Sequence, residues 1–247
     1  MKTLQYILWK EFSKQLLYSI GIFAALFLIL YIVEGVFTLF SGKLLQWHEP
    51  AFLVGIPASV IGVAYVLTIR NPQNYTGFVG GIIMSLLLAL QFYLLGNIDL
   101  VVLQLFVFIP FLLSSLFRWR RLGLQAEAKN SPFVPQWLPV QQRILSLILM
   151  IVVLVVDYAV ATEVIQHNAW GENVALKLMG GLMIASSTLA NFILIYQKID
   201  AWIWWVIYAI SGMVFYALIG NAFSFVLFTV FLLVNGSTGI VWIKLRK

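Results

Sequence analysis

The stretch LVVLQLFVFIPFLLSSLFRWRR, residues 100–121, decides the fold class of this chain. Residues 100–117 are almost entirely apolar, and a helix needs about 20 such residues to cross about 30 Å of hydrocarbon. The stretch ends in a cluster of three arginines around Trp119, and Lys and Arg collect on the cytoplasmic side of membranes. It therefore predicts a helix that crosses a membrane and ends in the cytoplasm.

The rest of the chain has the same composition. Of its 247 residues, 62% are hydrophobic and 10% are charged, whereas a soluble domain carries about 25% charged residues. The apolar stretches that could each form a spanning helix are 16–40, 51–69, 75–95, 100–117, 144–162, 175–197, 202–219 and 222–243. The sequence therefore predicts an all-α membrane protein with eight transmembrane helices.

The basic residues orient these helices. With the N-terminus in the cytoplasm, 13 of the 15 Lys and Arg residues fall on the cytoplasmic side, and only Lys43 and Lys177 fall outside. The reverse orientation would place this excess on the wrong side, so we expect both termini in the cytoplasm. Basic residues on this face meet anionic lipid, so the net charge of +6 predicts a lipid partner and no nucleic acid.

Motifs of catalysis and metal binding do not occur in the sequence. The chain has no cysteine, and its two histidines, His48 and His167, fall in predicted outer loops, where histidines are usually solvated. The chain also has no GxxxxGK[ST] loop for phosphates and no nucleophile motif. We therefore predict that the protein is not an enzyme and that it holds no catalytic residue, cofactor or metal.

The N-terminal region adds two predicted elements. Residues 1–14 place Leu4, Leu8 and Phe12 at helical spacing, which predicts a short helix lying in the membrane interface. The apolar run 16–40 follows, and it is longer than the 7–15-residue core of a signal peptide. We interpret that run as a transmembrane helix that the mature protein keeps.

Two groups of three helices echo each other. FYLLGN at 92–97 and FYALIGN at 215–221 each join the second and third helices of a group, and Trp119 and Trp242 follow at similar distances. The helix at 144–162 is an odd crossing that restores the orientation of the second group. The groups therefore form a parallel repeat of the 3+1+3 type, in which the first helix is extra.

This repeat divides the chain into four predicted segments, and the proline-rich loop within 118–143 is the seam between its halves. The predicted boundaries are 1–50 for the interfacial segment and extra helix, 51–119 for the first three-helix unit, 120–165 for the loop and linker helix, and 166–247 for the second unit. Transporters built from repeats bind their substrate near the midplane of the membrane, at the repeat interface. We expect alternating access by rocking of the two units.

Polar side chains inside the spans are the candidates for a substrate path, because an unpaired polar group in hydrocarbon is costly. Trp202, Trp205 and Tyr208 recur every three or four residues, so they form one helical stripe that can stack on a flat ligand. The predicted hydrogen-bonding partners are Gln91, Gln104, Ser187, Asn191 and Asn235. The alternatives are that Trp202 anchors the interface and that Ser187 bonds to its own helix.

Two carboxylates, Glu34 and Asp157, lie inside spans near the predicted outer interface. Carboxylates in a membrane can relay protons in a coupled transporter. Both, however, lie on helices outside the three-helix units. We expect them to have a hydrogen-bonded structural role.

Five short segments carry a resemblance to a known family. They are NY at 74–75, LQLFVF at 103–108, WLP at 137–139, KIDAWIWWVI at 198–207 and VNGSTGIVWIK at 234–244. In their order and spacing they resemble the PnuC family of vitamin transporters, over residues 51–247. The resemblance implies a fold similar to that of full-length SWEET transporters, association as homotrimers, and site residues at Gln104, Trp202, Trp205 and Asn235.

The function that the resemblance implies is facilitated diffusion of nicotinamide riboside, a vitamin B3 precursor, across the bacterial inner membrane. A cytosolic kinase would phosphorylate the substrate and trap it. Relatives carry thiamine or riboflavin, and Phe111, Ala209 and Thr238 replace polar or aromatic residues that relatives often carry. These departures bear on the choice of vitamin, because amide contacts discriminate between substrates. A proton-coupled transporter of another small solute and a non-transport scaffold subunit are the alternatives.

Overall fold

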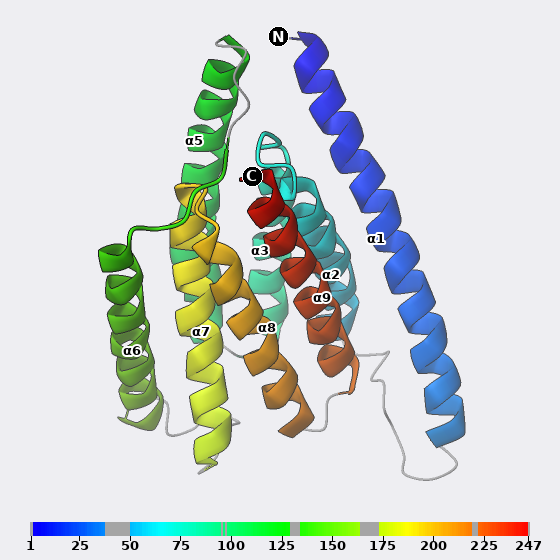
Figure 1. The fold of residues 1–247 in the computed structure, drawn as a ribbon. Coiled ribbons are helices and arrows are strands. Elements are labelled where there is room, and N and C mark those ends of the chain that lie inside the picture. Colours follow the sequence, from blue (N-terminus) through cyan, green and yellow to red (C-terminus); the bar gives the residue numbers. More distant parts are fainter. Residues whose placement is uncertain are drawn as a thin grey trace. The chain divides into compact units, whose positions relative to one another are not determined.

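Figure 1 shows the fold in a computed structural model that describes residues 2–37, 50–94, 96, 98–128, 134–163, 173–218 and 222–246. Its helices are α1 (Lys2–Phe37), α2 (Pro50–Ile69), α3 (Gly77–Leu94), α4 (Ile98–Leu103), the π-helical turn η1 (Gln104–Phe108), α5 (Ile109–Ala128), α6 (Val140–Glu163), α7 (Val174–Ile195), α8 (Asp200–Leu218) and α9 (Ala222–Leu245). Apart from one isolated bridge between Gln136 and Lys198, the described residues contain no β-structure.

Within the described residues, six helical stretches are long and apolar enough to cross a membrane, and each overlaps a predicted span. They cover 77–94, 100–125, 140–157, 174–195, 200–218 and 224–245. Helix α2 adds a shorter apolar stretch over Leu53–Ile69. The prediction of an all-helical membrane protein is therefore confirmed, whereas the count of eight crossings stays a prediction.

Two helices run further than expected. Helix α1 is continuous from Lys2 to Phe37, so residues 1–14 are not a separate interfacial helix. Helix α5 continues past the arginine cluster to Ala128. The reason is the same in both places: Leu, Lys, Gln, Ala, Glu and Arg dominate these segments, no proline interrupts them, and such residues propagate a helix at little cost.

The chain divides into two compact units, residues 1–134 and residues 135–247. In unit 1, the hairpin of α2 and α3 packs with α1 on the α2 side and α5 on the α3 side. In unit 2, α8 packs between α7 and α9, and α6 packs against α7. Each unit is therefore a bundle in which one helix, α3 or α8, packs between its two chain neighbours.

Three glycines of α3 bring the helices of unit 1 close together. A Cβ added to Gly77 would lie 2.8 Å from Ile69 Cγ2 of α2, and one added to Gly80 would lie 2.7 Å from Phe12 Cε2 of α1. A Cβ on Gly81 would lie 3.1 Å from a methyl carbon of α5. Small residues let helix backbones approach in membranes, where packing drives association. Helix α3 therefore uses glycine to contact three neighbours.

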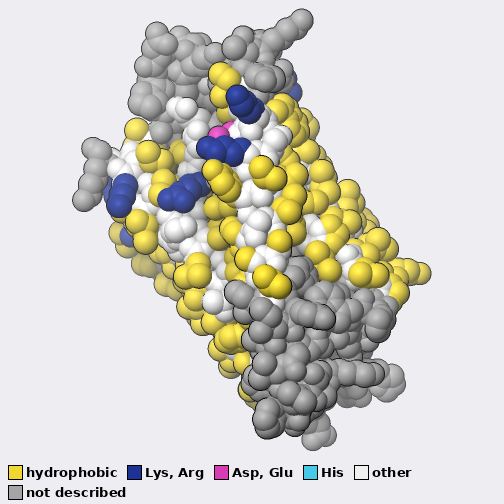
Figure 2. Space-filling view, turned by 90° about the vertical axis from the view of Figure 1, so that its right-hand side faces the viewer, with side chains coloured by type: hydrophobic (Ala, Val, Ile, Leu, Met, Phe, Trp, Pro, Cys, Tyr) yellow, Lys and Arg dark blue, Asp and Glu magenta, His cyan; other side chains and the backbone are white. Residues whose placement is uncertain are grey.

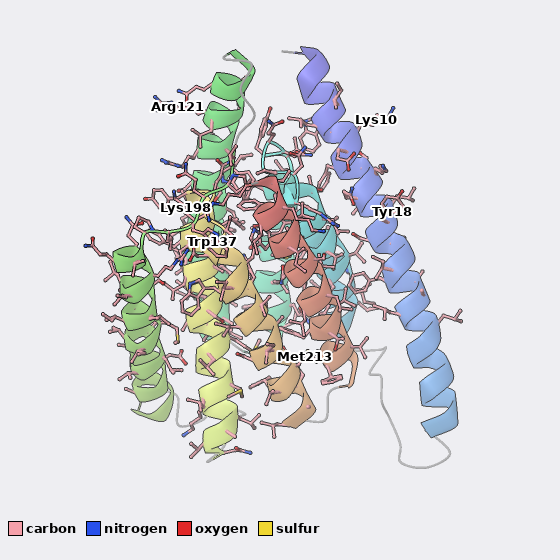
Figure 3. The ribbon with its side chains drawn as sticks, in the orientation of Figure 1. Lys10, Tyr18, Arg121, Trp137, Lys198 and Met213 are labelled. Atoms are coloured by element: carbon pink, nitrogen blue, oxygen red, sulfur yellow. The ribbon has the colours of Figure 1, made fainter. Side chains whose placement is uncertain are left out.

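Basic side chains of unit 1 gather at one end. Figure 2 shows Lys and Arg side chains among the hydrophobic side chains on the face it presents. Within unit 1, Lys10 of α1 and Arg121 of α5 lie toward the end at which the chain begins (Figure 3). This separation of charge from apolar surface is typical of a protein that spans a membrane.

Candidate functional site

The aromatic stripe of α8 divides into one buried ring and two partly open ones. Trp202 is 2% exposed and packs edge-on against Trp242 of α9, with the ring centroids 5.2 Å apart. Trp205 and Tyr208 are half-buried and form their own edge-on pair at 5.4 Å. Trp202 is therefore a packing residue at the start of α8, whereas Trp205 and Tyr208 keep surface for a ligand.

Helix α9 brings Asn235 to the level of Trp205. Gly239 lies against Trp202, since a Cβ on Gly239 would be 3.0 Å from Trp202 Cβ, and Gly212 lies against the ring of Phe228. The two helices are antiparallel with equal rise per residue, so Asn235, one turn before Gly239, lies about level with Trp205. Asn235 is 1% exposed.

Helix α7 contributes Asn191 at the same level. Gly180 of α7 lies against Phe215 of α8, and counting along these antiparallel helices places Asn191 level with the turn that carries Trp205. By the same count, Ser187 lies level with Tyr208. Three successive helices of unit 2 therefore carry, at similar heights, the six residues that the sequence predicted for this half.

The hydrogen bonds separate these polar groups into two kinds. Ser187 donates to the carbonyl of Met183 at 2.7 Å, and Asn191 Nδ2 donates to the carbonyl of Ser187 at 3.0 Å. By contrast, Asn235 Oδ1 and Trp202 Nε1 are buried and have no hydrogen-bond partner among the residues that the structure describes. A buried polar atom without a partner costs about 1–3 kcal/mol. Asn235 is therefore the amide with the most to gain from a ligand, and Ser187 fits the alternative of bonding to its own helix.

In unit 1 a π-helical turn presents Gln104. The amide of Ile109 donates to the carbonyl of Gln104, five residues earlier, and Pro110 follows without an N–H of its own. A missing N–H leaves a carbonyl unpaired in an α-helix, and a wide turn is one way to accommodate this change. Gln104 is 5% exposed, and its Oε1 has no hydrogen-bond partner in the described part of the chain. Wide turns of this kind are frequent at functional sites.

Gln91 lies close to the same level of unit 1. Its side chain covers Gly55 of α2, where an added Cβ would be 2.6 Å from Gln91 Nε2. Gly81 of α3 lies against Leu112 of α5, and counting along these antiparallel helices places Gln91 about level with Gln104. Gln91 and Gln104 therefore lie at similar heights along the helix axes of unit 1. The predicted polar residues of unit 2 likewise lie at similar heights along theirs. That all eight predicted residues bind a substrate stays a prediction.

The remaining predicted polar residues have different outcomes. Asp157 lies on α6 beside Gly181 of α7, where an added Cβ would be 3.0 Å from its Oδ2. Glu34, His48 and His167 lie outside the residues whose side chains are described. Among the described residues, no group of His, Cys, Asp and Glu could hold a metal ion.

Sequence reasoning missed Asp200. This carboxylate opens α8, is 4% exposed, and pairs with Arg143. The available signal was an acidic residue directly before the aromatic stripe, in IDAWIWW at 199–205. It was overlooked because Asp200 lies at the expected end of a span, where a charged side chain needs no partner.

Comparisons with known proteins agree with the helical bundle. The model of a family described as nicotinamide mononucleotide transporter matches residues 52–244. A solved structure, "Crystal structure of the Vitamin B3 transporter PnuC", is similar with a TM-score of 0.63 and 20% identity, and the match covers 96% of each chain. At this identity the likeness concerns the fold alone. No curated protein matches the chain.

Proposed function

The chain belongs to the nicotinamide mononucleotide transporter family, PnuC, and we propose that it carries nicotinamide riboside, a vitamin B3 precursor, across a membrane. Membership makes the chain a membrane transporter rather than an enzyme. The proposed mechanism is facilitated diffusion, in which the substrate moves down its gradient and phosphorylation by a cytosolic kinase prevents its return.

The observation that carries this proposal is the layer of unit 2 that contains Trp205, Tyr208 and Asn235, because it is aromatic and uncharged. Trp205 and Tyr208 offer two partly open rings, and the buried Asn235 Oδ1 has no partner. The nicotinamide ring of the riboside is a flat cation, and cations bind the faces of Trp and Tyr rings. Asn235 can accept a hydrogen bond from a ribose hydroxyl or from the carboxamide.

The charge of this level favours the riboside over the mononucleotide. A phosphate group is normally bound by Arg or Lys. The basic residues nearest in sequence are Lys198, seven residues before Trp205, and Lys244, nine residues after Asn235, or about 10 and 14 Å along the helices. A phosphate at the level of Trp205 would therefore have no Lys or Arg of α7, α8 or α9 at its own height.

The proposed topology is the 3+1+3 repeat with one extra helix and eight crossings. Its support is a repeated aromatic pair: Trp119 packs edge-on against Phe78 at 4.7 Å, as Trp242 does against Trp202 at 5.2 Å. The basic end of unit 1 would face the cytoplasm of a bacterium. The four segment boundaries and the homotrimer are part of the same proposal and rest on the family resemblance.

A binding experiment with purified protein tests the substrate. Tryptophan fluorescence or calorimetry would measure binding of nicotinamide riboside, nicotinamide mononucleotide, thiamine and riboflavin. We expect the riboside to bind most tightly and Trp205→Ala to weaken it at least tenfold. Trp9→Ala, which removes an exposed ring of α1, is the matched control and should bind normally. Equal or tighter binding of the mononucleotide, or binding of none of the four, would reject the proposal.

Proton coupling is the alternative that Asp157 allows. Its carboxylate lies against Gly181 of α7 and is partly buried. In proteoliposomes, facilitated diffusion predicts uptake that a pH gradient leaves unchanged, for wild type and for Asp157→Asn. If a gradient drives accumulation and Asp157→Asn abolishes it, the alternative is correct.

Preferred binding of thiamine, another flat cation, would keep the mechanism and change the vitamin.

A further inference from the structure

A buried carboxylate ties the start of α8 to the segment that precedes α6. The Asp200 side chain is 5% exposed. Its Oδ1 lies 2.7 Å from Arg143 Nε of α6, and its Oδ2 accepts a hydrogen bond from the backbone N–H of Leu138 at 2.7 Å. Both oxygens of the carboxylate are therefore used, on two partners from the same neighbouring segment.

Further contacts hold this segment against the turn between α7 and α8. The N–H of Ile199 donates to the carbonyl of Gln136 at 3.0 Å, next to the bridge between Gln136 and Lys198. The guanidinium of Arg143 lies 4.9 Å from the ring centroid of Trp137. Trp137 and Lys198 are close together in Figure 3. Arg143 is therefore itself oriented, by stacking on one side and by the carboxylate on the other.

The partners of Asp200 compensate the charge of its carboxylate. Removing a carboxylate from water is expensive unless a cation and hydrogen bonds replace the water. Asp200 has both, and it lies in the first turn of α8, where the helix dipole favours a negative charge. The charged groups that the described contacts place around it are Arg143 and, two residues earlier in the chain, Lys198.

Apolar packing already holds α8 to its neighbours without Asp200. Trp202 packs on Trp242 and on Gly239, and Gly212 packs on Phe228. The Arg143 side chain is 41% exposed, so its ion pair with Asp200 adds little net stability, while the two contacts of the carboxylate fix its position. What Asp200 adds is therefore a fixed axial position and rotation of α8.

That rotation matters because of where the stripe begins. Trp205 follows Asp200 by five residues and Tyr208 follows by eight, so both rings move with the helix turn that Asp200 ties down. We propose that Asp200, held by Arg143 and the Leu138 N–H, is a positioning residue that sets the orientation of Trp205 and Tyr208 toward the substrate. This inference rests on the proposed function of the stripe.

The test compares affinity with stability in a set of variants. Asp200→Ala should weaken nicotinamide riboside binding about tenfold, and Asp200→Glu should recover part of the loss because it restores the charge. Arg143→Gln should weaken binding to a similar degree, and adding Asp200→Ala to it should cost less than threefold more, since the two residues act as a pair. Lys198→Gln, which removes a neighbouring cation bonded only to the Gln136 side chain, is the control and should change affinity less than twofold.

A second readout needs no substrate. The chain contains no cysteine, so Ile210→Cys, at an exposed position of α8, accepts a single spin label. Asp200→Ala should increase the mobility of this label, and Lys198→Gln should not. The inference is overturned if Asp200→Ala leaves both affinity and label mobility as in wild type, or if Asp200→Ala only lowers the melting temperature. If wild type binds no riboside while the label responds as expected, the proposed function fails and the positioning of α8 by Asp200 stands.

Discussion

The two units have the same kind of aromatic packing at one end of their bundles, but their central helices carry different residues beyond it. Trp119 and Trp242 are both almost fully buried, against Phe78 of α3 and Trp202 of α8. Beyond this pair α3 continues with closely packed glycines, whereas α8 continues with Trp205 and Tyr208. The difference teaches that the same aromatic pair can support two kinds of bundle: glycines bring the helices of unit 1 close together, whereas unit 2 places the large rings of Trp205 and Tyr208 on its central helix.

The starts of the central helices differ in a related way. The hydroxyl of Thr76, just before α3, lies 2.6 Å from Asn74 Oδ1 and 3.2 Å from the carbonyl of Leu8 in α1. Asp200, at the start of α8, accepts from the N–H of Leu138 and pairs with Arg143 at the start of α6. In each unit an added helix is therefore attached at the start of the central helix. Helix α1 has in unit 1 a place similar to that of α6 in unit 2, with a neutral contact instead of an ionic one.

The largest expected effect comes from removing the shared aromatic pair. Trp119→Ala and Trp242→Ala should each destabilise the protein by about 3–5 kcal/mol, because each removes a fully buried ring. Only Trp242→Ala should also weaken substrate binding, since Trp242 supports the helix of the stripe. Thermal unfolding in detergent and a binding titration on the folded fraction measure the two effects. Equal losses of affinity in both variants would show that the units do not differ in this respect.

A glycine of the second unit gives the next largest effect. In Gly212→Ala the new Cβ would lie 2.0 Å from two ring carbons of Phe228, which also packs on Tyr208 and Tyr216. We expect a loss of about 1–3 kcal/mol from overpacking, measured as a lower melting temperature. Gly236→Ala on α9 has no atom within 4 Å of the new Cβ. This control should leave stability unchanged or raise it, and a fall as large as that of Gly212→Ala would contradict the packing argument.

Replacing the unpartnered amides should separate stability from function. Asn235→Leu and Gln104→Met each remove a buried oxygen that has no hydrogen-bond partner, so each should raise stability by about 1 kcal/mol. Both should weaken binding, if each unit contributes an amide to the substrate. The matched variant Asn191→Leu removes an amide that already donates within α7 and should not be stabilising. Unfolding with and without riboside distinguishes these outcomes, and a loss of stability in Asn235→Leu would show that its oxygen is satisfied.

The smallest effect is expected at the neutral contact of unit 1. Thr76→Val removes a hydroxyl that contacts both the carbonyl of Leu8 and Asn74 Oδ1, and it should cost about 1 kcal/mol, with no change in affinity. Thr68→Val, whose hydroxyl bonds only to the carbonyl of Ala64 one turn earlier, should cost less. Comparing both with Asp200→Ala tests whether the neutral attachment of α1 and the ionic attachment of α6 differ in function. A loss of affinity in Thr76→Val would give α1 the same role as α6.

The polar residues illustrate how far sequence reasoning reached. The spacing of Trp202, Trp205 and Tyr208 predicted one stripe, because helical periodicity is a local property. It did not predict that Trp202 is closed off by Trp242, since that depends on the register of α8 against α9. Ser187 was predicted as a candidate on chemical type alone, and its bond to Met183 depends on a rotamer that the sequence does not specify.

What the sequence determined by itself is the class of protein: its apolar lengths, its charge bias and its family. The apolar lengths and the charge bias follow from the free-energy cost of leaving backbone and charged groups in hydrocarbon. This cost depends on the composition of each segment by itself. What only the tertiary structure decided is which polar atoms keep a partner. Asp200 has two, whereas Asn235 Oδ1 and Gln104 Oε1 have none. A hydrogen bond between helices requires that two atoms of different helices lie within about 3 Å of each other. The residue pattern along one helix does not specify that distance.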